Sequence, residues 1–584
     1  MLFRSIFDMI RASVALMCLL SGIAVWPQDE KKPSYPSYDY EAARQHEIEP
    51  HRREVRLEGI EGGFNQLRVV LTVSPAGDVV SADATGNIDS LKYWPQLQTE
   101  VLQWKFTPFE VNGTPIAAEV EEYIDLAPPE RLPKSHVAPP VVRPNSEIAI
   151  TLARTSCFGI CPSYQVTVGT GGIEFEGHSG AVAAGKHKDR VDADEVRTLA
   201  RRFVTADFYS MDSIYRASVT DNPTYILSVT IDGHKKEVED YVGSWVGMPA
   251  VISELEDAVD TFARTERWIS GKDGLVQTLR AEKFNFRTFD AQVMLKEAAS
   301  RGTATTVREL LVAGVPLVPL PAPKPTEAYM RAPFEDVGWL NAASGNLDTL
   351  QVLINAAASK DDQNDKDLAL AGAARSGSVE GARALITYGA NPNADLSKLV
   401  VVESGGGSGV GLGKGAGSVL IYAAESGNPE MLREILRYDP KLEAQDSDGR
   451  TAMFAAAEYR HRDKDGARVE CVRLLAAAGA NLNARDRRGN TPLHETFLTD
   501  VEQELLKLGA DVNAQNEDGE TPIFTTVDVD AIPLFAEHGA DLTIRNKNGE
   551  TVLEAAKQRG PMIQEALRKA IAKSNQMQQA TVAN

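Results

Sequence analysis

The chain has 584 residues, with 61 Lys and Arg against 82 Asp and Glu, which gives a formal net charge of −21. That length predicts several domains. The negative charge argues against a protein that wraps nucleic acid or lies on an anionic membrane surface.

The N-terminal segment has the pattern of an export signal. Two arginines precede an apolar run over 12–26, which is shorter than the roughly 20 residues that a membrane-spanning helix needs. We therefore predict a signal peptide over 1–24, which places the protein in the periplasm or outside the cell. The alternative is an uncleaved segment that anchors the protein to the inner membrane. Residues 25–52 are polar and rich in Tyr and Pro, and we expect a disordered tether.

Residues 53–126 have the pattern of a small α+β domain. A β-branched run over 67–73 closes at a Pro-Ala-Gly-Asp turn, and 79–85 follows as its hairpin partner. Apolar residues at near-helical spacing predict a helix over 90–103. A last strand is expected over 119–126.

This first region resembles the TonB C-terminal domain family. The resemblance rests on the segments VVLTVSPAGDVV and LQWKFTP and on the turn NGTPI. It implies an α+β domain exposed in the periplasm. A TonB energy transducer ends with this domain, whereas here several hundred residues follow it. Energy transduction is therefore an alternative, and contact with protein or peptidoglycan is the preferred expectation.

A second α+β domain is predicted over 146–271, behind a Pro-rich, semi-rigid linker over 127–145. Its expected strands and helices are 148–152, 165–168, 173–175, 194–203, 225–231, 236–241 and 249–265.

The second region resembles an uncharacterised bacterial domain family that often occurs in secreted or envelope proteins. The resemblance rests on CFGICPSY, which ends at Tyr164, on TDNPT, which contains Asp221, and on Trp268. The family implies no known reaction. For Tyr164, Asp221 and Tyr241 we expect turn hydrogen bonds and strand packing, with a surface groove as the alternative.

Cys157 and Cys161 are the close thiol pair of the sequence, and three interpretations compete. A structural disulfide suits an exported chain. A metal site needs further ligands, which His178, His187 or an Asp would supply. A redox-active pair is the third interpretation, although the spacing is C-x3-C and not C-x2-C.

A repeat array is predicted over 285–573. Gly489, Gly519 and Gly549 recur every 30 residues, and each follows a polar turn that leads into two short helical segments. Turn, helix, helix and terminal Gly resemble the ankyrin family, and His494 matches the His of its Thr-Pro-Leu-His motif. A hydrogen-bonding His is the expected role.

The array is expected to contain about eight repeats and to fold alone, because at least three repeats make a stable stack. Insertions are predicted at 316–333, 398–417 and 460–468, and a disordered tail at 574–584. The glycines over 399–418 do not have the spacing of a phosphate-binding loop.

These patterns together predict a multidomain protein, in which two small α+β domains precede an all-α ankyrin-repeat solenoid. We expect an exported, non-enzymatic scaffold that binds a protein partner through the concave face of its repeats. No cofactor, metal or nucleic acid is expected, and the sequence leaves the oligomeric state open. Alternatives are a thiol- or metal-dependent activity at Cys157 and Cys161 and a TonB-type transducer.

Overall fold

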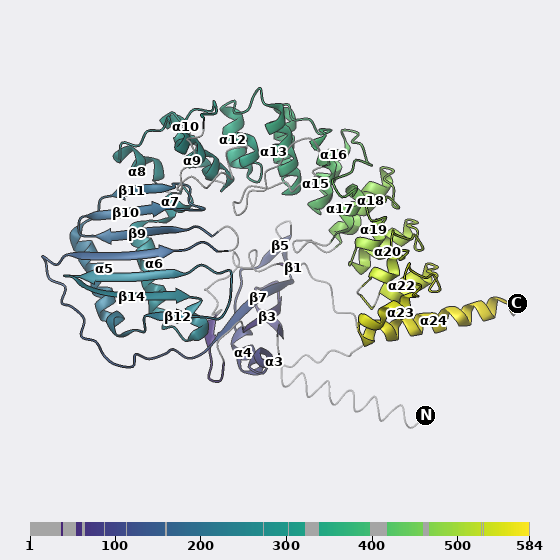
Figure 1. The fold of residues 1–584 in the computed structure, drawn as a ribbon, viewed down its shortest axis with the longest axis horizontal. Coiled ribbons are helices and arrows are strands. Elements are labelled where there is room, and N and C mark those ends of the chain that lie inside the picture. The colour runs from purple at the N-terminus through teal and green to yellow at the C-terminus, as the bar shows by residue number, and fades with distance from the viewer. Residues whose placement is uncertain are drawn as a thin grey trace. The chain divides into compact units, whose positions relative to one another are not determined.

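The computed structural model describes residues 37–38, 54–60, 65–86, 88–111, 114–157, 161–272, 274–301, 303–321, 338–396, 417–458, 466–526, 528–529 and 531–582. The chain divides into two compact units, Met1–Pro128 and Pro129–Asn584, which we describe separately (Figure 1). The predicted signal peptide and most of each predicted insertion lie outside the described residues. Among the described residues, no helix is both long and apolar enough to cross a membrane.

The first unit is built on a five-stranded sheet in which β7 is central. The strand order is β1-β7-β3-β4, and β2 also pairs with β7. The strands are β1 (Ser37–Tyr38), β2 (Glu54–Arg56), β3 (Gln66–Val73), β4 (Val79–Gly86) and β7 (Ala118–Ala127), beside a small hairpin of β5 (Phe109–Val111) and β6 (Thr114–Ile116). The predicted tether over 25–52 therefore contains one short strand, β1, which runs parallel to β7.

The strand, hairpin, helix and strand order of this unit agrees with the prediction. Along β3, every second residue is buried, so one face of the sheet meets the core. The predicted single helix over 90–103 is instead two helices, α3 (Ile88–Leu91) and α4 (Trp94–Val101). Pro95 lies in the first turn of α4, where it lacks an N–H to continue the preceding helix, so a new helix begins.

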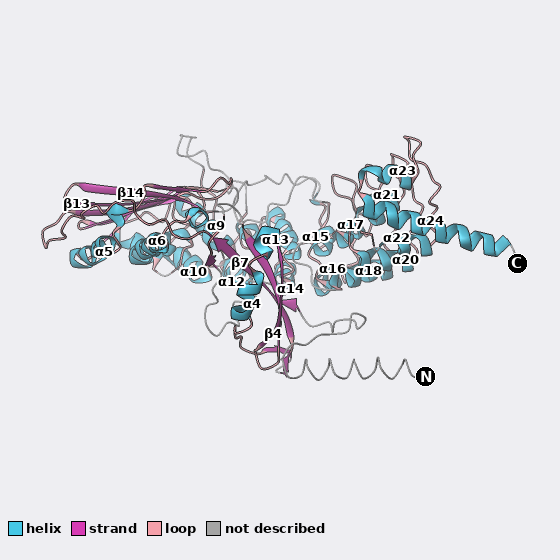
Figure 2. Cartoon of the chain, turned by 90° about the horizontal axis from the view of Figure 1, so that it is seen from below, coloured by secondary structure: helices cyan, strands magenta, loops and turns pink. Residues whose placement is uncertain are grey.

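The second unit opens with a seven-stranded sheet in the order β11-β10-β9-β8-β13-β14-β12. Helices α5 and α6 lie together on one face of it (Figure 2). The strands are β8 (Ile148–Arg154), β9 (Tyr164–Gly169), β10 (Gly172–Gly177), β11 (Gly185–Asp189), β12 (Ile214–Arg216), β13 (Tyr225–Ile231) and β14 (His234–Tyr241). The helices are α5 (Ala193–Thr205), α6 (Ala250–Ala263) and α7 (Glu266–Ile269), with 3₁₀ turns η1 (Phe208–Ser210) and η2 (Gly243–Val246).

The proline-rich segment is not a free linker, which corrects the prediction for 127–145. Ala127 ends β7, and the residues that follow Pro128 are bonded to the sheet domain. Arg131 N–H donates to the Gly247 carbonyl at 2.7 Å, and the Val137 N–H donates to Ser210 Oγ at 2.8 Å. Proline density gives an extended chain, and these bonds fix that chain on the domain surface.

Helix pairs make up the rest of the second unit. In the described residues we count eight pairs: α9 (Phe289–Ser300) with α10 (Ala304–Ala313), α11 (Trp339–Ala342) with α12 (Leu347–Asn355), α13 (Gln363–Arg375) with α14 (Val379–Thr387), α15 (Val419–Glu425) with α16 (Pro429–Leu436), α17 (Ala452–Ala457) with α18 (Ala467–Ala477), α19 (Pro492–Glu495) with α20 (Thr499–Lys507), α21 (Pro522–Thr525) with α22 (Ala531–Glu537), and α23 (Val552–Ala555) with α24 (Pro561–Val582). A 3₁₀ turn, η5 (Ala556–Gln558), follows α23. Helix α24 continues through most of the predicted tail over 574–584.

The pairs stack so that helices of the same kind form two rows. Each first helix packs on the next first helix, from α9 and α11 to α21 and α23, and each second helix packs on the next second helix, from α10 and α12 to α22 and α24. The second row begins one helix earlier than predicted, because α8 (Leu275–Ala281) packs on α10. This helix lies in the stretch that the sequence left unassigned between the sheet domain and the array.

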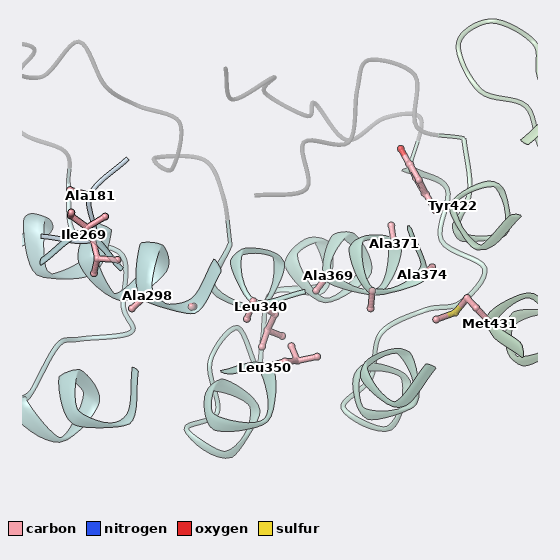
Figure 3. Packing of buried hydrophobic residues seen from close by; sticks show 14 of the residues in the cluster. Ala181, Ile269, Ala298, Leu340, Leu350, Ala369, Ala371, Ala374, Tyr422 and Met431 are labelled. Atoms are coloured by element: carbon pink, nitrogen blue, oxygen red, sulfur yellow. The ribbon is translucent and has the colours of Figure 1, made fainter. Parts of the chain in front are cut away.

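One hydrophobic core joins the sheet domain to the array. It runs from Ile148 to Ala570, and Figure 3 shows part of it, from Ala181 and Ile269 to Tyr422. Side chains of the array also bond to the sheet domain, as Thr306 Oγ1 does to the Gly271 carbonyl. The array therefore does not start as a free stack at residue 285. The sheet domain and α8 cover its first helix pair, as a capping repeat would.

The predicted insertion over 460–468 ends earlier than expected, and its last arginine is buried. Helix α18 begins at Ala467, and Arg468 is only 2% exposed. Its guanidinium donates to the carbonyls of Ala424 and Glu425, at the end of α15, at 3.2 and 2.9 Å. It also donates to the Ala455 carbonyl of α17 at 2.7 Å. A cation thus bonds to buried carbonyls at the ends of two helices, where a positive charge is favoured.

We expect Arg468→Met to lower the free energy of unfolding by about 2–3 kcal/mol, because buried carbonyls lose a charged donor. Urea denaturation of the full chain measures the effect. Arg433→Met is the matched control, since Arg433 is half exposed and pairs with Glu470 on the surface. That change is expected to cost less than about 1 kcal/mol. Equal losses for the two variants would contradict the assignment.

Candidate functional site

The most regular exposed feature of the array is a row of four turns, which we call fingers 1 to 4: residues 446–450, 486–490, 516–520 and 546–550. In each finger the side-chain oxygen of the first residue accepts backbone N–H bonds from the third and fifth residues. Asp486 Oδ1, for example, accepts from Arg488 and Asn490, both at 2.8 Å. The fourth residue is Gly with φ between 74° and 81°, which L side chains rarely adopt.

Successive fingers are joined through their backbones. The N–H of Arg487 donates to the Asp448 carbonyl at 2.9 Å. In the same way Glu517 donates to Arg488, and Lys547 to Asp518, both at 2.8 Å. A Cβ on Gly489 would lie 3.0 Å from the Glu517 nitrogen, so glycine is also needed for this close approach. The fingers form one fixed row.

The tips of the fingers carry exposed charges that change sign from one finger to the next. We call them the tip charges: Asp448 in finger 1, Arg487 and Arg488 in finger 2, Glu517 and Asp518 in finger 3, and Lys547 in finger 4. Within the described part of the chain, no ion pair joins any of these six side chains to another group.

Unlike the tip charges, several charges on the second row of helices form ion pairs from one repeat to the next. Arg383 of α14 binds Glu434 of α16 at 2.8 Å. Arg473 of α18 binds Glu504 of α20 at 2.7 Å, and Lys573 binds Glu537 at 3.0 Å. These charges of the second row thus have partners within the array, whereas the tip charges face solvent and remain available to a partner.

His494 has the hydrogen-bonding position that its motif predicted. Its Nδ1 accepts from the Thr491 N–H at 3.1 Å, and Nε2 lies 3.0 Å from the Glu520 carbonyl at the base of finger 3. The side chain is 2% exposed, and burial lowers the pKa of the imidazole. A neutral, buried His of this kind ties one repeat to the next finger.

Cys157 and Cys161 form a disulfide, with their Cα atoms 5.5 Å apart. The bridge follows β8 and lies beside the TDNPT loop, because Thr155 N–H donates to the Thr224 carbonyl at 3.0 Å. With both sulfurs bonded to each other, neither is a thiolate ligand. His187, which was offered as a metal ligand, is buried against Glu282, 3.2 Å from its Nδ1. Among the described residues, no cluster of His, Cys, Asp and Glu has the arrangement of a metal site.

Replacing both cysteines by Ser is expected to lower the free energy of unfolding by about 2 kcal/mol, as loop closure over so short a segment implies. Urea denaturation measures the loss, and reductant added to the unaltered chain is expected to reproduce it. The variant itself is expected not to respond to reductant. Equal stability of the chain and the variant without reductant would contradict the prediction.

A group of buried carboxyls lies between the sheet and α6, and no sequence pattern predicted it. Glu256 of α6 is 6% exposed, Asp240 of β14 is 8% exposed, and Asp260 lies one turn beyond Glu256. Burial, followed by the charges of Asp240, Asp257 and Asp260, raises the pKa of Glu256 to about 9. Its Oε1 has no hydrogen-bond partner in the described structure. Glu256 is therefore a neutral acid at pH 7.

Tyr164 and Tyr241 have the structural roles that we expected. The Tyr164 hydroxyl donates to Asp260 Oδ2 at 2.7 Å, inside the core. Tyr241 donates to the Val219 carbonyl at 3.1 Å. Asp221 lies in the intervening turn with φ of 70°. Tyr241 thus holds the TDNPT loop against the sheet, and Tyr164 ties the sheet to α6. Both tyrosines are buried, so they do not line a surface groove.

Comparisons with known proteins identify two of the regions. The family model described as a domain of unknown function (DUF6438) matches residues 148–263, from β8 to α6. The family model described as ankyrin repeats (3 copies) matches residues 420–516, which include fingers 1 and 2. The chain thus contains a DUF6438 domain in its sheet-containing N-terminal part and ankyrin repeats in its helical C-terminal part.

Three curated relatives share a shorter stretch. Diacylglycerol kinase iota of Homo sapiens is 38% identical over 101 residues, which is 17% of this chain and 9% of the relative. The proteins of the same name from Rattus norvegicus and Mus musculus are 40% and 39% identical over 101 residues, again 9% of each relative. The chain thus spans about a tenth of the length of these relatives.

Proposed function

We propose that this protein is an exported, non-enzymatic scaffold that binds a protein partner through its ankyrin repeats in the cell envelope. The observation that carries the proposal is the fixed row of fingers, whose exposed charges have no partner within the described chain. Ankyrin repeats suggest protein–protein interaction, because a stacked array presents one extended surface and no enclosed cleft.

Two observations support the location. The N-terminus has the composition of a signal peptide, and disulfides such as Cys157–Cys161 persist in oxidising compartments. The resemblance of residues 53–126 to the TonB C-terminal domain agrees with a periplasmic position. Export predicts an intact mass that lacks residues 1–24 when the protein is purified from its native envelope. A full-length mass would instead favour the anchored form.

Affinity capture tests the binding function. The full chain with an affinity tag is used to capture proteins from an envelope extract, and captured proteins are quantified by mass spectrometry. The matched control replaces the charges of fingers 2 and 3 by Arg487→Gln, Arg488→Gln, Glu517→Gln and Asp518→Asn. We expect at least one different protein to be captured by the unaltered chain and lost with the control. If the two chains capture the same proteins in the same amounts, the array surface is not the binding site.

A further inference from the structure

We propose that the finger row is an interface between two copies of this chain, related by a two-fold axis. The inference rests on the proposed function, since it takes the same row as a binding surface, and it names a second copy as a partner. It follows from the order of the tip charges, which is antisymmetric about the middle of the row.

The tip charges alternate in sign along the row. Counting the tip charges alone, finger 1 has one negative charge, finger 2 two positive charges, finger 3 two negative charges and finger 4 one positive charge. The other charged residues of the fingers and their flanks are bonded within the array or half-buried. Asp446 and Asp486 accept backbone N–H bonds of their own fingers, and Arg450 pairs with Glu495. Arg485 donates to the carbonyls of Gly489 and Gln515, Arg545 pairs with Glu554, and Glu520 and Glu550 are half-buried at the finger bases.

A two-fold axis through the centre of the row turns this order into complementary pairs. In an interface of this symmetry, if a residue of one copy meets a second residue of its partner, the second also meets the first. Finger 1 then faces finger 4, so that Asp448 meets Lys547. Finger 2 faces finger 3, so that Arg487 and Arg488 meet Glu517 and Asp518. All tip charges of both copies gain an opposite charge.

Two alternative registers are repulsive. A parallel arrangement places each finger against its own copy, and every contact then joins like charges. An antiparallel arrangement shifted by one finger brings finger 1 to finger 3 and finger 2 to finger 2, which again joins like charges. A parallel arrangement shifted by one finger joins opposite charges, but it leaves one finger unpaired on each copy and is not closed by a two-fold axis. Repulsion in the first two registers narrows the choice, and the unshifted two-fold arrangement is the one that pairs every tip charge of both copies. Charge complementarity fixes register more than it adds affinity.

The fixed backbone of the row favours such an interface. The three N–H to carbonyl bonds between successive fingers hold the tips at a constant spacing, so two copies present matching intervals. Little ordering of backbone is then needed when the copies meet. Because the pairs are exposed, added salt screens them, since the Debye length falls to about 3 Å at 1 M salt.

Charge exchange in the purified full-length chain tests the proposal, with sedimentation velocity as the measurement over chain concentrations of about 1 to 200 µM. The first variant carries Arg487→Glu and Arg488→Glu, and the second carries Glu517→Arg and Asp518→Arg. We expect the unaltered chain to dimerise at low salt, and each variant alone to associate at least about ten-fold more weakly, because fingers 2 and 3 then repel.

Two restored pairings make the test decisive. An equimolar mixture of the two variants is expected to form a mixed dimer, because the four central contacts become opposite charges again. A chain with all four substitutions is expected to dimerise with itself for the same reason. Circular dichroism of each variant checks that the exposed substitutions leave the fold intact.

Three sedimentation results would contradict the two-fold interface. A chain that stays monomeric at low salt, or single variants that dimerise as the unaltered chain does, would overturn the proposal. So would a mixture that fails to associate. If the chain is monomeric but still captures a different protein from the envelope extract, this inference is wrong and the proposed function stands. If the chain dimerises and the extract yields only further copies of it, the inference stands and the proposed function is wrong.

Discussion

Trp268→Ala is expected to lower the free energy of unfolding by about 3–5 kcal/mol, the range for removal of a large buried aromatic side chain. The side chain is fully buried. Its ring stacks on the ring of Phe175, with the two centroids 4.7 Å apart. The Arg267 guanidinium lies over the Trp268 ring, 4.0 Å from its centroid. The backbone carbonyls of Trp268 and Ile269 also accept from Ala183 and Val182, at 2.8 and 3.0 Å.

The measurement is urea denaturation followed by far-ultraviolet circular dichroism, a signal to which the repeat helices contribute strongly. Because one core joins the sheet domain to the array, we expect the helical transition to move although the substitution lies in the sheet domain. Trp268→Phe is the matched control. It keeps a stacking ring and removes an indole N–H that has no hydrogen-bond partner in the described residues, so the expected loss is about 1–2 kcal/mol. A helical transition unmoved by Trp268→Ala would contradict the shared core.

Glu256→Gln is expected to make the protein more stable at pH 8 while leaving its stability at pH 5 nearly unchanged. The pKa of Glu256 is about 9 in the folded chain, against 4.5 as its ordinary value. Between these values the folded state holds a proton that the unfolded state has released. The stability that this proton gives is complete below pH 4.5 and is lost as pH rises, by up to about 1.4 kcal/mol per pH unit. Gln has the same shape as the neutral acid and does not titrate.

Chemical denaturation at pH 5, 6.5 and 8 measures this difference, which we expect to reach about 2–4 kcal/mol at pH 8. Glu254→Gln is the matched control, since Glu254 lies on the same helix and is exposed. This control is expected to keep the pH dependence of stability that the unaltered chain has. Burial also raises the pKa of Asp240, so some pH dependence will remain in Glu256→Gln. A difference between the chain and Glu256→Gln that stays constant from pH 5 to 8 would contradict the assignment.

Local patterns predicted much of the fold. Strand β13 has the predicted bounds, and α5 begins within one residue of its predicted start. Asp192 caps this helix, because its Oδ1 accepts from the Asp194 N–H at 2.7 Å. Strands β11 and β12 were missed. The first is GKHKD, in which only His187 is buried, and the second has three residues. Both gain their stability from neighbouring strands, which a short polar sequence does not reveal.

Long-range burial explains the other differences. Arg468 was placed at the end of the predicted insertion over 460–468, and charged residues are rarely buried. The carbonyls that hold it belong to two other helices, which no local pattern indicates. Glu256 and Asp240 are distant in sequence, so no spacing brings them together. One local signal existed for Glu256: it lies on the side of α6 that buries Ile252, Leu255 and Val259, where an acid is unexpected. The 30-residue period that relates fingers 2, 3 and 4 made these turns the most predictable part of the candidate site.

The stacking of α8 on α10 gives the array a direction of growth. The sheet domain precedes the repeats in the chain, so it is the first part of the second unit to be synthesised. Its sheet pairs β8 with β13 and β14 with β12, which are slow contacts between distant segments. Each later helix pair needs only its predecessor. Once α8 is in place, the repeats can add to it one after another from that end, and the slowest step for the unit falls on the sheet domain.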